Sequence, residues 1–211
     1  RSSDLPEVIL AAIVIHAVMG LIKIRELKQL SKMSRLEFTV AMIALLGVLI
    51  FGILKGVMLA VIISLILLIR KTSVPRVSVL GRIGNSEHYS DISRHPDNIR
   101  IPGTLIMRPE SSILYFNAES IRDSIMNEID AQKDTRALVI DLSAAPYLDV
   151  GGSGMLVDMV RDLKRRGIEV RVASALAQGR DMLRKSGMED ITGHISRAEG
   201  IQEAIHALQN T

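Results

Sequence analysis

The sequence predicts a membrane α-helical segment followed by a small α/β domain whose mixed sheet is flanked by helices. Two observations lead to this fold class. Residues 1–71 contain three long apolar stretches, whereas residues 105–211 alternate short apolar runs with amphipathic patterns, which is typical of strands alternating with helices. Residues 1–75 hold nine Lys/Arg and four Asp/Glu, while residues 76–211 hold seventeen and nineteen. The net charge of +3 therefore does not describe a uniformly basic, nucleic-acid-binding protein.

Three apolar stretches in the first part are predicted to cross a membrane, at about residues 5–24, 38–54 and 56–69. A membrane-spanning helix needs about 20 mostly apolar residues, so the third stretch is short for a span. Apolar residues surround each predicted helix, which argues against the alternative of a buried hairpin in a soluble protein. Lys55 alone separates the last two stretches, with Gly52 and Gly56 on either side, and this pattern predicts a tight helical hairpin.

Basic residues give the predicted orientation. Lys and Arg are frequent in residues 23–37 and again in residues 70–82, and such residues favour the cytoplasmic side of a membrane. Three crossings then place residues 70–211 in the cytoplasm, and the stretch 24–35 is expected to lie as a helix at the membrane surface. His16 is the ionisable side chain deep in the first stretch. It is either a polar functional site in the membrane or a hydrogen-bonded helix-packing residue.

The second part predicts strands and helices after a polar linker. Residues 72–104 are rich in Ser, Gly, Pro and Asn and are expected to be the linker, with an extended piece at 77–80, which leaves 105–211 as the domain. A turn between two apolar runs predicts a hairpin of 105–107 with 113–116, and Asn117 is expected to cap the helix that follows. Further along the chain we predict strands at 137–142 and 169–173, and helices at 155–166, 180–185 and 198–208.

The stretch DLSAAPYLDVGGSGMLVDMV, residues 141–160, is the candidate site. A glycine-rich turn between a strand and a helix directs backbone N–H groups toward an anion, so Asp149, Gly151, Gly152 and Ser153 form a candidate regulatory or ligand-facing turn. The turn lacks the lysine of a phosphate-binding loop, so the motif does not support nucleotide binding. The structural alternatives are Ser153 as a helix cap and Asp149 as an acceptor of backbone hydrogen bonds.

Other chemistry finds little support in the sequence. No His or second carboxylate stands near Asp149, so we expect no enzyme and no cofactor. Cysteine is absent and the histidines are scattered, so we expect no metal site. The basic run RDLKRRG, residues 161–167, is either a solvated helix end or a contact with an anionic membrane surface. Nucleic acid is not an expected partner, because aromatic residues do not interleave with these charges.

Four segments together resemble the C-terminal end of the sulfate permease (SulP) family of anion transporters: LPEVILAAIVIHAVMGLI, SRLEFTVAMIALLGVLIFGILKGVMLAVIISL, LIMRPESSILYFNAESIRD and VIDLSAAPYLDVGGSGML. The last two are similar to the sulfate transporter and anti-sigma factor antagonist (STAS) domain. The resemblance implies that the three predicted membrane helices belong to the gate or scaffold part of such a transporter. The anion site of the family lies between broken helices outside this sequence, so no substrate-binding residue is assigned to it.

The resemblance also implies a cellular role. It implies a multi-pass protein of the cell membrane with a cytoplasmic STAS domain, secondary active transport and a homodimer in contact with membrane lipid. The substrate would be an anion such as sulfate, bicarbonate, chloride or a dicarboxylate. The STAS domain would have a regulatory or assembly role, with a cytoplasmic protein as its partner. Because the sequence starts with Arg and no basic region precedes the first apolar stretch, we expect no signal peptide and a longer natural chain.

The alternative is a membrane-tethered STAS signalling module of the anti-sigma factor antagonist type, without transport activity. Stand-alone antagonists of this fold carry a phosphorylated serine in an Asp-Ser-Ser-Gly motif. Alignment of Asp149 and Gly152 with that motif puts Val150 and Gly151 at the two serine positions. The missing serines argue against the alternative, and Ser153 lies one residue beyond the motif.

Overall fold

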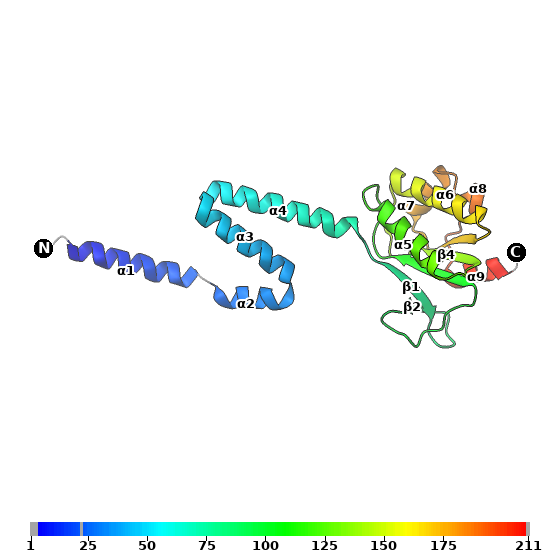
Figure 1. Cartoon of the computed structure of the whole chain (residues 1–211), viewed down its shortest axis with the longest axis horizontal. Coiled ribbons are helices and arrows are strands. Elements are labelled where there is room, and N and C mark those ends of the chain that lie inside the picture. Colours follow the sequence, from blue (N-terminus) through cyan, green and yellow to red (C-terminus); the bar gives the residue numbers. More distant parts are fainter. Residues whose placement is uncertain (1–3, 22, 210–211) are drawn as a thin grey trace. The chain divides into compact units, whose positions relative to one another are not determined.

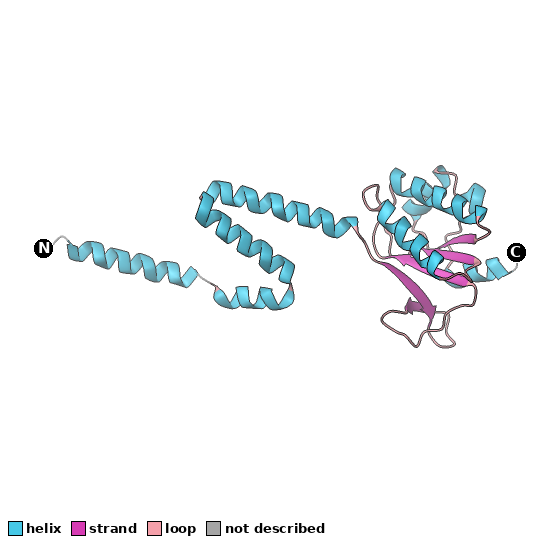
Figure 2. Cartoon of the chain, viewed as in Figure 1, coloured by secondary structure: helices cyan, strands magenta, loops and turns pink. Residues whose placement is uncertain are grey.

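The chain forms two compact units, which we describe separately. The structure is a computed structural model that describes residues 4–21 and 23–209. The first unit covers residues 1–69 and is helical, and the second covers residues 70–211 and contains the sheet (Figure 1, Figure 2).

The first unit contains the helices α1 (Asp4–Leu21), α2 (Ile24–Met33), α3 (Arg35–Phe51) and α4 (Ile53–Ser73), the last of which runs into the second unit. Ser34 separates α2 from α3 and caps α3, because its Oγ accepts a hydrogen bond from the backbone N–H of Glu37 at 3.3 Å. The predicted surface stretch 24–35 is therefore a helix over most of its length. Its position at a membrane surface stays a prediction.

The hairpin turn lies at Gly52 and not at Lys55, which corrects the predicted connection. Gly52 has φ = +81°, a conformation that glycine adopts without strain, and Lys55 lies inside α4. A Cβ on Gly56 would lie only 2.4 Å from the Cα of Val48, so α3 and α4 can meet here only because Gly56 has no side chain. The two helices diverge from this corner (Figure 1).

Helix α4 is longer than the predicted stretch 56–69. Its 21 residues make it the one helix, among the residues that the structure describes, that is long and apolar enough to cross a membrane by length and composition. The helices α1 and α3 have 18 and 17 residues, and their span assignments stay predictions.

The second unit contains a five-stranded sheet in the order β2-β1-β3-β4-β5. The two parallel pairings join β3 (Thr104–Pro109) to β4 (Ala137–Asp141) and β4 to β5 (Glu169–Ala173). The two antiparallel pairings join β1 (Val77–Arg82) to β3 and to β2 (Tyr89–Asp91). The predicted mixed sheet is confirmed. The predicted linker 72–104 is wrong, because β1 and β2 lie within it and the domain begins well before residue 105.

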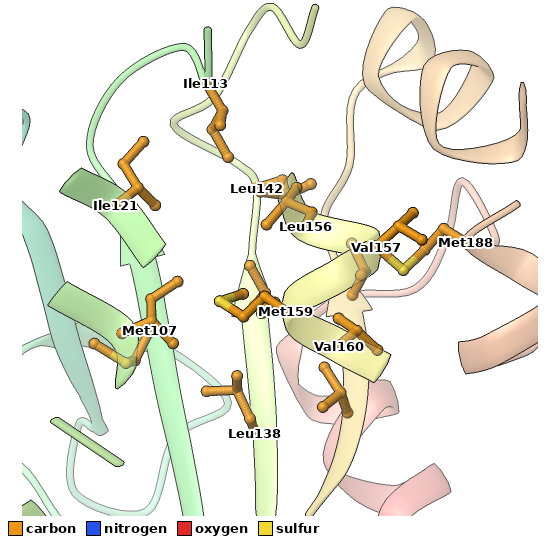
Figure 3. Packing of buried hydrophobic residues seen from close by; sticks show 14 of the residues in the cluster. Met107, Ile113, Ile121, Leu138, Leu142, Leu156, Val157, Met159, Val160 and Met188 are labelled. Atoms are coloured by element: carbon orange, nitrogen blue, oxygen red, sulfur yellow. The ribbon is translucent and has the colours of Figure 1, made fainter. Parts of the chain in front are cut away.

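Helices cover both faces of this sheet. One face packs against α5 (Ala118–Ala131), α6 (Val150–Arg165), α7 (Ala177–Lys185) and α8 (Glu189–Thr192), and the other against α9 (Ile201–Gln209). Residues of β4 alternate between the two cores: Leu138 and Ile140 face α5 and α6, whereas Val139 packs with Ala204 and Ile205 of α9. All five β4 residues are buried, as expected for an inner parallel strand (Figure 3).

Two sequence predictions at the edges of these elements are wrong. Residues 113–116 do not pair with β3, since Ile113 forms an isolated parallel bridge with Leu148 instead. Asn117 precedes α5 as predicted, but its side chain does not cap the helix. Its Oδ1 accepts a hydrogen bond from the backbone N–H of Leu114 at 2.8 Å, so it orders the loop before the helix.

Candidate functional site

The candidate turn is where the chain passes from β4 into α6, and Asp149 organises it. One oxygen of its carboxylate, Oδ1, accepts a hydrogen bond from the backbone N–H of Gly152 at 2.7 Å, which caps α6. The other, Oδ2, accepts a hydrogen bond from the backbone N–H of Tyr115 at 2.9 Å. The interpretation of Asp149 as an acceptor of backbone hydrogen bonds is confirmed. One side chain therefore caps the helix and holds the loop 113–116 against its first turn.

Gly151 and Gly152 allow this loop to lie directly on the start of α6. A Cβ on Gly151 would lie 2.7 Å from the Cβ of Tyr115, and one on Gly152 would lie 2.4 Å from the carbonyl oxygen of Ile113. Contacts this short exclude any side chain at either position without movement of the loop. The glycines thus serve close packing between a loop and a helix. Their ligand-facing role stays a prediction.

Ser153 does not cap α6, which corrects the sequence-based interpretation. The helix begins at Val150, five residues earlier than predicted, so Ser153 lies in its first turn. Its side chain is 1% exposed, and its Oγ donates a hydrogen bond to the carbonyl of Val150 at 3.0 Å. A kinase cannot reach this hydroxyl while the first turn of α6 stays folded. The regulatory role proposed for Ser153 is untested.

Asp141 and Arg108 form an ion pair where β4 ends, before the turn. Asp141 ends β4, is fully buried, and its Oδ2 accepts a hydrogen bond from Nε of Arg108 on β3 at 2.6 Å. The same carboxylate accepts hydrogen bonds from the backbone N–H and the hydroxyl of Ser143 at 3.1 and 3.0 Å. Buried charges persist where they are paired in this way, so Asp141 fixes the chain where it leaves β4. The sequence analysis missed this pair, because its two residues lie on different strands.

An exposed apolar surface surrounds the start of α6, and the sequence analysis missed it as well. We call it the aromatic surface, and it consists of Tyr115, Phe116, Tyr147 and Val150. Tyr115 and Val150 are 77% and 76% exposed, and the rings of Tyr115 and Phe116 meet edge to face with centroids 5.6 Å apart. The chain has only three Tyr and three Phe, so half of its aromatic residues gather here. Exposed apolar groups that cluster at one place are typical of a contact site for another molecule.

The remaining predicted sites are as follows. His16 is exposed on α1, and within the described residues it has neither a hydrogen bond nor an ion pair, so its role stays a prediction. No group of three potential metal ligands occurs in the part of the chain that the structure describes.

The basic side chains of the run 161–167 are each ion-paired, namely Arg161 with Asp158, Lys164 with Glu169, Arg165 with Asp162 and Arg166 with Asp130. These charges are thus largely neutralised within the domain.

Comparisons with protein families match both units. Residues 95–202 match the STAS domain, and residues 2–44 match the sulfate permease family. Sulfate transporter 1.3 of Arabidopsis thaliana is 28% identical over 95% of this chain and 32% of its own length. Sulfate transporter 3.2 of the same plant is 31% identical over 96% of this chain and 33% of its own length. The chain thus spans about a third of the length of these relatives.

Solved structures share the fold. The murine Slc26a9 anion transporter in its inward-facing state matches 87% of this chain and 30% of its own, with a TM-score of 0.75 and 19% identity. A second structure of SLC26A9 matches 88% of this chain and 32% of its own, with a TM-score of 0.72 and 16% identity. At these identities the likeness shows the fold alone.

Proposed function

The chain belongs to the STAS domain family, joined to a first part of the sulfate permease type, and from this premise we propose that it forms part of a secondary active anion transporter. The supporting observation is that both parts occur in one chain, in the order found in the sulfate transporters that match 95% of it. The proposed chemistry is the binding and movement of an anion such as sulfate, without bond making. The proposed place is the cell membrane, with the STAS domain in the cytoplasm.

The two units would have different roles in the transporter. The glycine-packed corner between α3 and α4 makes these helices a fixed hairpin, which suits a scaffold against which a mobile transport part moves. The STAS domain would have a regulatory role, in which a cytoplasmic protein binds the aromatic surface around Tyr115 and Val150. The helices that would hold the anion lie outside this sequence, so the chain by itself is not expected to transport.

Transport is tested with the complete reading frame that contains this chain. The frame is expressed in cells that lack their own sulfate uptake, and the uptake of radiolabelled sulfate is measured beside that of cells expressing residues 1–211 alone. We expect uptake from the complete frame and none from the 211 residues. A complete frame that encodes no further apolar segments would contradict the proposal.

The role of the aromatic surface is tested in the same cells with Val150→Ser and Tyr115→Ser. A matched control is Ile83→Ser, since Ile83 is an exposed apolar residue elsewhere in the domain. We expect the first two substitutions to change the uptake rate while the control leaves it unchanged. Equal uptake rates in all three variants would contradict the proposed role of the aromatic surface.

The alternative, a signalling module switched by serine phosphorylation, has less support. Val150 and Gly151 occupy the two serine positions of the antagonist motif, and the hydroxyl of Ser153 is buried. Incubation of the chain with ATP and candidate kinases, followed by mass spectrometry, is expected to find no phosphate on Ser153. Phosphate at that position in the folded chain would favour the alternative.

A further inference from the structure

Helix α2 carries a concentration of positive charge that the rest of the structure does not neutralise. Five exposed basic side chains lie on it or directly beside it: Lys23, Arg25, Lys28, Lys32 and Arg35. Of these, only Lys23 forms an ion pair among the described residues, with Glu26 at 2.9 Å. The basic run near residue 165 differs, because each of its cations has an acidic partner within the domain. The four unpaired cations of α2 are thus available to an external anion.

The charges of α2 occupy one face of the helix. Arg25, Lys28 and Lys32 are spaced three and four residues apart, so they project from the same side. Leu27 and Leu30 are three residues apart and lie on the opposite side, whereas Ile24 precedes Lys28 by four residues and lies beside the basic face. Leu27 and Leu30 are half-buried, whereas Ile24 is 64% exposed. This division into a basic face and an apolar face is typical of helices that lie in the plane of a membrane surface.

The position of α2 next to α3 indicates which molecule its cations bind. Ser34 alone separates α2 from α3, which is apolar from Val40 to Phe51, and the two helices contact each other. A basic, amphipathic helix beside a helix of this kind lies where phospholipid headgroups are. Unpaired cations at this depth are complementary to the negative headgroups of the cytoplasmic leaflet.

We propose that α2 binds the surface of an anionic phospholipid bilayer, with Arg25, Lys28 and Lys32 in contact with the headgroups and Leu27 in the acyl boundary. The inference rests on the proposed membrane hairpin, and it adds that α2 binds lipid whose headgroups are negatively charged. Bound in this way, α2 fixes the start of α3 at the membrane surface.

The test uses the full 211-residue chain, which has no cysteine and so accepts one label at a chosen place. Leu27→Cys and Gln29→Cys carry an environment-sensitive fluorophore on the apolar face and beside the basic face. Each labelled chain is placed in vesicles of phosphatidylcholine alone, or of equal parts phosphatidylcholine and phosphatidylglycerol. We expect the negative lipid to shift the emission at residue 27 to the blue and to leave residue 29 unchanged. The shift is expected to be lost at about 1 M salt, where the Debye length is about 3 Å.

Charge variants distinguish binding through the basic face of α2 from a general attraction of basic side chains to negative lipid. Arg25→Gln, Lys28→Gln and Lys32→Gln are combined in the chain labelled at residue 27, and we expect the response to negative lipid to be lost. The matched control combines Arg161→Gln, Lys164→Gln and Arg165→Gln, which removes the same charge from α6 and is expected to keep the response. Loss of the response in the control, or an equal blue shift in neutral vesicles, would overturn the proposal. Circular dichroism checks that each variant is folded, and the salt dependence of the unsubstituted helix tests the proposal without the charge variants.

Failure of the membrane hairpin is distinguishable from failure of this inference. A chain that does not float with either kind of vesicle contradicts the membrane hairpin. A chain that floats with both, but whose label at residue 27 does not respond to negative lipid, contradicts only the binding of anionic lipid by α2.

Discussion

The carbonyl oxygen of Ile113 lies 2.4 Å from the position that a Cβ on Gly152 would occupy. This contact joins a loop after β3 to the first turn of α6, although the two residues are 39 positions apart in the sequence. The glycine-rich turn is therefore occupied by the protein's own backbone. A phosphate held there would have to replace the loop 113–116, and this explains why the start of α6 carries glycines without the other groups of a phosphate-binding loop.

Gly152→Ala is expected to destabilise the STAS domain by about 1–3 kcal/mol, because the backbone of Ile113 must move to admit the methyl group. Gly154→Ala is the matched control in the same helix, since a Cβ there meets nothing within 4 Å and alanine favours helix by up to about 1 kcal/mol. All three tyrosines lie in the domain and the chain has no Trp, so tyrosine fluorescence during urea unfolding reports on this domain. Equal stability of both variants would show that the loop does not press on Gly152.

Asp149→Ala is expected to lower the free energy of unfolding by about 1–2 kcal/mol, because α6 loses its cap. The loop also loses the acceptor of the Tyr115 N–H. Asp149→Asn is expected to cost less, since asparagine is also a good N-cap but offers one acceptor oxygen in place of two. The same fluorescence measurement decides, and a larger loss for asparagine than for alanine would contradict the capping geometry.

The pH dependence of the free energy of unfolding tests the interactions of Asp91 on β2. Burial alone would raise the pKa of Asp91, but hydrogen bonds from the backbone and hydroxyl of Ser93 and the charges of Arg76 and Arg94 outweigh it and hold the pKa below its usual 3.8. A depressed pKa stabilises the folded state fully above the usual value, and this contribution is lost as the pH falls through the folded-state pKa. Asp91→Asn is therefore expected to be less stable at neutral pH and to lose less stability below about pH 4. Parallel acid profiles of the two proteins would contradict this assignment.

The elements predicted from the sequence are those whose pattern is local. The strand near 137–142 is a short apolar run and the strand near 169–173 alternates charged and apolar residues, while Ala204 and Ile205 of the last helix are buried. The mixed sheet and the flanking helices follow from the alternation of such runs. These features need no knowledge of which segments meet in space.

The features that the sequence analysis missed depend on distant contacts. The sequence analysis predicts part of β1 as the extended piece 77–80 but assigns β1 and β2 to a polar linker, because β1 carries Ser78 and Gly81 between its apolar residues and β2 has three half-buried residues. The start of α6 was missed because Gly151 and Gly152 have low helix propensity, which their packing against Tyr115 and Ile113 overrides. The aromatic surface forms only when Tyr115 and Tyr147, 32 residues apart, come to the same end of the sheet.

Gly56→Ala is expected to open the hairpin of α3 and α4, because the added Cβ would meet the backbone of Val48 at 2.4 Å. Gly47→Ala is the matched control, since its Cβ would approach Gly56 only to 3.6 Å, an ordinary contact. Cysteines at Val40 and Ser64, which line the groove between the two helices, can be joined by a thiol-specific bifunctional reagent in this cysteine-free chain.

The yield of that cross-link in vesicles measures how often the two helices lie within reach of the reagent. We expect a high yield in the unsubstituted hairpin and with Gly47→Ala, and a low yield with Gly56→Ala. If both alanine variants form the cross-link equally well, the close approach at Gly56 does not hold the hairpin. The proposed scaffold role would then need another source of rigidity, because apolar side chains alone do not drive two helices together within lipid.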